Sequence, residues 1–154
     1  MASMRDIKRR RDSIQSTGQI TKAMKLVSTV KLQKAKGKAE STKPYFDLMY
    51  ETVCSMLAKS GNINHKYLNA GSSEKKAVIV ITANRGLAGG YNSNITKLVT
   101  NGDIRKEDAL IYAIGRKGRE VFDRKGYTIK ADYSDVIDNP MYTDAKQICD
   151  EVLK

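Results

Sequence analysis

The spacing of apolar positions divides the chain into two parts of different character. In the first part, apolar side chains recur at helical intervals, and no proline occurs before Pro44. The spacings between them are seven, six, four, three and three residues, at Ile7, Ile14, Ile20, Met24, Val27 and Val30. This pattern predicts one long helix with a thin apolar stripe that is not a strict heptad repeat.

Pro44 interrupts this helical pattern. A further helical run extends from Tyr45 to Lys59, so residues 1–59 are expected to form one shaft helix kinked at Pro44 or two successive helices. Residues 60–76 are polar and rich in Gly, Ser and Asn, which predicts a linker.

Residues 77–154 alternate between strand-like and helix-like patterns. Strands are expected at 77–81, 109–114 and 127–133, with helices around 95–99, at 119–125 and at 144–153. The continuous β-branched run at 77–81 predicts a strand buried on both faces. The order predicts an α/β fold with a small, incomplete, Rossmann-like parallel sheet. A three-stranded sheet has exposed edges, and the last helix has no cap, so we expect this domain to be truncated at its C-terminus.

The positive charge is concentrated in the first quarter of the chain. The formal net charge is +11, and residues 1–43 hold twelve Lys and Arg against three acids, which is +9. This asymmetry predicts an acidic partner, either nucleic acid, anionic lipid or protein, and the alternative is a solvated helix face. Nucleic acid is disfavoured because the basic helix has no aromatic side chain for base stacking. A helix with so thin a stripe is unstable alone and needs a partner.

Three glycines follow the first predicted strand. Gly86, Gly89 and Gly90 give the spacing G-x-x-G-G, which fits neither the dinucleotide-binding nor the P-loop pattern. Gly115-Arg116-Lys117-Gly118 follows the second strand, where an acid would bind ribose. We expect the three glycines to allow a tight turn and close helix–sheet packing. A small nucleotide-binding α/β protein remains the alternative.

Side chains suited to catalysis or metal binding are sparse. His65 is the single histidine, and no nucleophilic triad has a recognisable spacing. The acids Asp132, Asp135 and Asp138 lack the glycine of an EF-hand loop. We therefore expect no catalytic residue, no cofactor and no metal site, and we expect Cys54 and Cys149 to be buried or half-buried thiols.

Three motifs resemble one known family. Met4-Arg5-Asp6-Ile7 with GQITKAMKLVSTVKL (18–32), NRGLAGGYNSN (84–94) and GRKG (115–118) occur in the order found in the gamma subunit of F-type ATP synthase. Ala83-Asn84 stands where that family often has Ser-Asp, and Ala88 where it often has Cys. The resemblance covers essentially the whole chain but only the N-terminal half of a family member.

The resemblance implies a non-catalytic rotor subunit that transmits torque between a proton-driven c-ring and a catalytic ring of alpha and beta subunits. Its partners would be alpha, beta, epsilon and the c-ring, without nucleic acid. It would lie peripherally on the cytoplasmic face of a bacterial membrane. The partner-binding residues expected from the resemblance and from the apolar stripe are Arg9, Arg10, Arg11, Ile20, Lys22, Ala23, Met24, Lys25 and Val27.

Overall fold

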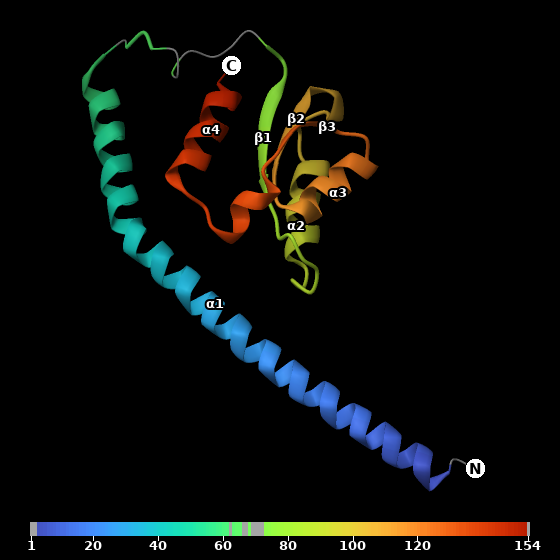
Figure 1. Ribbon diagram of the computed structural model, residues 1–154. Helices are drawn as coiled ribbons and strands as arrows, with labels where there is room; N and C mark the ends of the chain where they lie inside the picture. Colours follow the sequence, from blue (N-terminus) through green and yellow to red (C-terminus); the bar gives the residue numbers. More distant parts are fainter. Residues whose placement is uncertain (1–2, 62, 66–67, 69–72, 154) are drawn as a thin grey trace. The chain divides into compact units, whose positions relative to one another are not determined.

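A computed structural model describes residues 3–61, 63–65, 68 and 73–153. The chain divides into two compact units, Met1–Asn69 and Ala70–Lys154. The first contains one long helix and the second contains a three-stranded sheet with helices, which confirms the predicted α/β class with a long N-terminal helix (Figure 1).

Helix α1, Met4–Lys59, is 56 residues long. It begins at a capping box in which the Ser3 hydroxyl accepts from the Arg5 amide at 3.3 Å and the Asp6 carboxylate accepts from the Ser3 amide at 3.2 Å. These contacts satisfy amides that the first turn leaves without helical partners. The helix continues through Pro44, so two separate helices are excluded. Figure 1 shows α1 changing direction between its cyan and green parts, as expected where a proline removes one backbone hydrogen bond.

The second unit alternates strands and helices. Its elements are β1 (Lys76–Ile81), α2 (Tyr91–Thr100), β2 (Ala109–Ile114), α3 (Arg116–Arg124), β3 (Thr128–Asp132) and α4 (Tyr142–Val152). Short 3-10 turns occupy Lys106–Asp108 and Ser134–Asp138. The strands are parallel in the order β1-β2-β3, and Val80 pairs with Ala113 in the β1–β2 register. The predicted Rossmann-like pattern is thus present as three strands.

The core of this unit lies between the sheet and the helices α2 and α3. Val80, Ile111 and Phe122 are buried there, and Ile95 and Val99 of α2 pack against them. The Phe122 and Tyr127 rings meet edge to face with centroids 5.2 Å apart. Figure 1 shows α4 on the other side of the sheet from α2 and α3.

Two expectations about burial are wrong. Strand β1 is buried on one face only: Val80 lies in the core, whereas Ile79 and Ile81 alternate to the other face and are 47% and 56% exposed. Strand β1 is an edge strand of the sheet, and α4 leaves this part of it uncovered. Both cysteines are exposed, Cys54 on α1 and Cys149 on α4.

The boundaries of the predicted elements differ in detail. The β2 limits, 109–114, agree with the prediction, and β3 is one residue shorter at each end. Helix α3 begins at Arg116, three residues before the predicted start. The described residues of the predicted linker 60–76 form neither helix nor strand, except Lys76, which begins β1. The remaining residues of the linker lie outside the described part of the chain.

Candidate functional site

The carboxyl ends of β1 and β2 are where a nucleotide-binding α/β protein would hold its ligand. In this chain the first amides of α3 are occupied by the segment that follows β1. The Arg116 amide donates to Asn84 Oδ1 at 2.9 Å, and the Lys117 amide donates to the Ala83 carbonyl at 3.1 Å. The Gly118 amide donates to Thr82 Oγ1 at 2.8 Å. The three donors that would bind a phosphate at a helix N-terminus therefore have partners within the chain.

Thr82 fits against two glycines of the GRKG motif. Its hydroxyl also donates to the Gly115 carbonyl at 3.1 Å, and its side chain is 2% exposed. A Cβ on Gly115 would lie 2.0 Å from the Thr82 carbonyl oxygen, and one on Gly118 would lie 2.8 Å from Thr82 Oγ1. Gly115 and Gly118 therefore allow α3 to approach the end of β1 closely. Neither Thr82 nor Asn84 was predicted to be a site residue, although a Thr and an Asn within three residues of the end of the first strand were the available signal.

The three glycines singled out in the sequence lie in the loop between β1 and α2. Gly89 has a φ of 56°, which favours glycine, and Gly90 is the N-cap of α2. A Cβ on Gly86 or Gly89 would meet no atom within 4 Å, so these two positions do not bring a helix close to the sheet. Leu87, between them, is fully exposed and has a φ of 61°.

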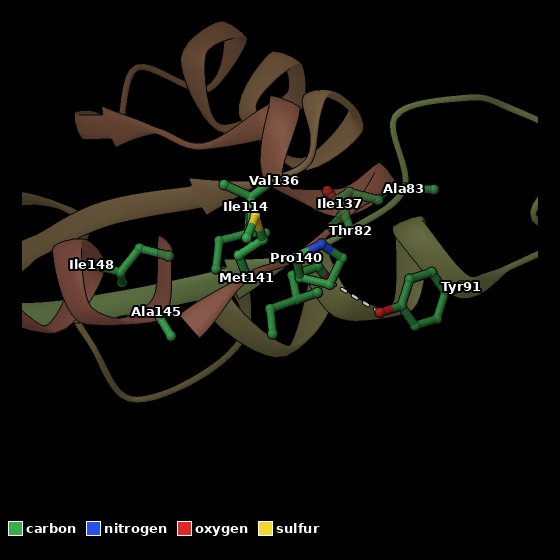
Figure 2. A pocket seen from close by; sticks show the side chains of 11 residues that line it. Thr82, Ala83, Tyr91, Ile114, Val136, Ile137, Pro140, Met141, Ala145 and Ile148 are labelled. Carbon is green, nitrogen blue, oxygen red and sulfur yellow. Dashed lines mark hydrogen bonds between the residues drawn. The ribbon is translucent and has the colours of Figure 1, made fainter. Parts of the chain in front are cut away.

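An apolar pocket of about 480 Å³ opens beside this edge of the sheet. Figure 2 shows Ile148 and Ala145 of α4 on one side and Tyr91 on the other, with the Tyr91 hydroxyl donating to the Ile81 carbonyl at 3.0 Å. None of the residues lining the pocket is charged. A phosphate group entering it would meet no cation, so the pocket does not favour nucleotide binding.

Two carboxylates near α3 are held in their ionised form. The Lys117 ammonium, 2.8 Å away, lowers the pKa of Glu120 through a hydrogen bond. Burial opposes ionisation of Asp132, but hydrogen bonds from Ser134 and Arg119 outweigh it and lower the pKa. Neither carboxylate is therefore poised as a general acid or base near neutral pH.

Tyr133 follows β3 and has a buried hydroxyl. Burial raises its pKa to about 12, and the carboxylate of Glu151 in α4 adds to the shift. The hydroxyl therefore stays protonated at neutral pH.

The surface of α1 is the second candidate site. No described residue of this helix is buried. All six apolar residues of the predicted stripe are between 54% and 65% exposed: Ile7, Ile14, Ile20, Met24, Val27 and Val30. Apolar surface of this extent on a single helix favours association with a partner.

The basic residues predicted to bind partners also lie exposed along α1. Arg11 pairs with Asp12 at 2.8 Å, whereas Arg9, Arg10, Lys22 and Lys25 form no ion pair within the described part of the chain. The structure places Lys22, Ala23, Met24 and Lys25 in consecutive exposed positions, within little more than one helical turn. This stretch presents two cations and one large apolar side chain together.

The described residues provide no group of three potential metal ligands, and no described helix is long and apolar enough to cross a membrane. The observed arrangement is suited to binding other macromolecules through α1.

Comparison with known proteins gives a consistent result. A family model described as "ATP synthase" matches residues 3–154. The "ATP synthase gamma chain" of Lachnoclostridium phytofermentans is 71% identical over 153 residues, which cover 99% of this chain and 53% of the relative. The protein of the same name from Alkaliphilus metalliredigens is 46% identical over 94% of this chain and 50% of its own length.

A third relative carries a more specific name. The "ATP synthase gamma chain, sodium ion specific" of Acetobacterium woodii is 40% identical over 146 residues, covering 95% of this chain and 48% of the relative. The chain thus spans about half the length of the curated relatives it matches.

Proposed function

Because the chain belongs to the ATP synthase gamma family, we propose that it is the N-terminal half of the central-stalk rotor subunit of an F-type ATP synthase. In this role α1 forms one helix of an antiparallel pair that stands inside a ring of alternating alpha and beta subunits. The α/β unit lies below that ring, near the epsilon subunit and the c-ring. The subunit itself catalyses no reaction.

The mechanism that we propose is torque transmission. Proton flow turns the c-ring, the c-ring turns the gamma subunit, and the asymmetric shaft drives each beta subunit through states of different nucleotide affinity. The subunit itself lies peripherally on the cytoplasmic face of a bacterial membrane, where the complex holds it. One relative is named as sodium ion specific, so a different coupling ion occurs within the family.

The observation that carries the proposal is the surface of α1. A rotating shaft must contact successive partners without binding any of them permanently. The apolar side chains of α1 are exposed but interrupted, and the spacing of six between Ile14 and Ile20 breaks the continuity of the stripe. Exposed apolar side chains in an interrupted pattern provide contact area for the surrounding ring without a continuous seam that would bind one ring subunit permanently.

The charge of α1 supports acidic partners in the ring. Lys22 and Lys25 flank Met24, and all three are exposed. Cations at such positions steer an acidic segment of a beta subunit through attraction that salt screens. We propose that residues 22–25 face that segment, and that Arg9, Arg10 and Arg11 contact the ring at a second position.

The decisive experiment uses the complete gamma subunit that contains this sequence, assembled with its alpha, beta, epsilon and c subunits in vesicles. We expect ATP-driven proton pumping, and we expect Lys22→Gln with Lys25→Gln to reduce it severalfold more than Lys34→Gln with Lys38→Gln. The second pair removes the same charge from the same helix. Assembly without pumping in the unmodified subunit would refute the proposed function, and equal losses in both variants would refute the role of residues 22–25.

A further inference from the structure

A groove of about 400 Å³ lies between α2 and α3, and it shares no lining residue with the apolar pocket. Lys97 of α2 forms one side, and Lys117, Glu120 and Arg124 of α3 form the other, with Lys125 at the end of α3. Here this surface is called the basic groove. It belongs entirely to the α/β unit, so nothing about it depends on α1.

The basic groove has an excess of positive charge. It contains four cations, Lys97, Lys117, Arg124 and Lys125, and one acid, Glu120. Lys117 is paired with Glu120 at 2.8 Å, whereas the other three cations form no ion pair within the described residues. Arg124 is held over the helix because its Nε donates to the Glu120 carbonyl at 3.1 Å. Three unpaired cations therefore border one groove.

The lining argues against a nucleic acid or a polyphosphate as the occupant. No aromatic side chain lines the groove, so bases would have no stacking surface. Glu120 lies among the cations, and Lys117 lowers its pKa, so an entering polyphosphate would meet a fixed negative charge. A polypeptide avoids this repulsion because its own amides can donate to Glu120 while its carboxylates meet the cations.

We propose that the basic groove is a docking surface for an acidic segment of a partner polypeptide. Its carboxylates pair with Lys97, Arg124 and Lys125, and its backbone donates to Glu120. Open grooves lined by charge give specificity and a fast association rate more than high affinity. The interaction should therefore weaken as the salt concentration increases.

The test is a lysine footprint of the full 154-residue chain with poly-L-glutamate as the probe. We expect the acetylation of Lys97 and Lys125, read by mass spectrometry, to slow by about fivefold at low salt. Lys130 and Lys146 are exposed lysines of the same unit outside the groove, and we expect their rates to change little. Equal slowing at all four lysines would overturn the proposal.

A pair of matched variants separates the groove from general charge attraction. Lys97→Gln should abolish most of the protection of Lys125, whereas Lys130→Gln, which removes the same charge, should leave it intact. Equal loss in both variants would overturn the proposal. So would protection of Lys97 and Lys125 by inorganic polyphosphate, or by vesicles of anionic lipid, as strong as that given by poly-L-glutamate.

Discussion

Gly115 occupies a position that excludes any side chain. Its φ is 118°, and a Cβ there would lie 2.0 Å from the Thr82 carbonyl oxygen, which belongs to the backbone and cannot rotate away. Strain of this kind is relieved only by moving the sheet and α3 apart.

We predict that Gly115→Ala destabilises the α/β unit by roughly 2–4 kcal/mol. Gly86→Ala is the matched control, because nothing lies within 4 Å of a Cβ at that position and its φ is negative. The control should change the unfolding free energy by less than about 0.5 kcal/mol. Urea unfolding followed by near-ultraviolet circular dichroism measures both, and similar midpoints for the two variants would contradict the prediction.

A second prediction at the residue scale concerns pH. The pKa of Tyr133 is raised to about 12 in the folded chain, so the neutral phenol is favoured by folding. The unfolded pKa is about 10. The resulting contribution to stability is complete below about pH 10 and is lost as the pH rises toward 12.

The measurement compares the unmodified chain with Tyr133→Phe in urea unfolding between pH 8 and pH 12. Phenylalanine cannot ionise, so we expect the variant to lose less stability over the upper part of this range. Identical pH profiles for the two proteins would show that Tyr133 does not titrate as the structure indicates.

At the scale of the element, α3 shows why part of the fold was not predictable locally. Its sequence begins Gly-Arg-Lys-Gly, which has no Ser, Thr, Asp or Asn to cap a helix, and the helix was therefore expected to begin only at residue 119. The caps come from Thr82, Ala83 and Asn84, more than thirty residues earlier in the chain. Because these hydrogen-bond acceptors follow β1, the sequence around α3 alone does not reveal them.

Strand β1 shows a related limit. Its apolar run correctly predicted a strand, because the strand period and β-branched composition are local properties. Whether a strand is covered on both faces depends on which helices lie over it. The exposure of Ile79 and Ile81 could therefore not be predicted from residues 77–81 alone. The same distinction applies to the candidate sites. The basic residues of α1 are close together in sequence and could be predicted, whereas the residues of the basic groove come together only because α2 and α3 lie next to each other.

The prediction at the element scale concerns Pro44. It lies inside α1, where it can donate no amide hydrogen bond and where its ring disfavours a straight helix. We predict that Pro44→Ala straightens α1 and slows amide hydrogen exchange at residues 40–48 by about tenfold. The other proline of the chain, Pro140, lies outside the helices and provides the control, since Pro140→Ala should leave exchange in α1 unchanged. Unchanged exchange at residues 40–48 in Pro44→Ala would contradict this account of the bend.

At the scale of the whole molecule, the two units differ in what stabilises them. The α/β unit has a buried core around Ile111 and Phe122, whereas no described residue of α1 is buried. Residues 1–43 carry a net charge of +9, which opposes the close approach of two such helices. In the isolated chain, α1 therefore has no packing partner that would stabilise it. Its positive charge also opposes association with α1 of a second copy.

We predict that amides of α1 exchange far faster than those of β2 in dilute, low-salt solution, because isolated helices gain little from propensity alone. Raising the salt concentration screens the repulsion, so α1 should then associate with other copies through its apolar stripe. Helicity measured by circular dichroism should increase with protein concentration at high salt, together with the mass measured by sedimentation equilibrium.

Single substitutions identify the surface responsible for this association. Met24→Gln removes an apolar side chain from the stripe, while Leu26→Gln removes one of similar size about 200° around the helix. If the stripe forms the contact, Met24→Gln should shift the association to higher protein concentration, and Leu26→Gln should have a smaller effect. Strong exchange protection of α1 in a chain that sedimentation shows to be monomeric would contradict the argument, because it would require a source of stability that the exposed helix does not contain.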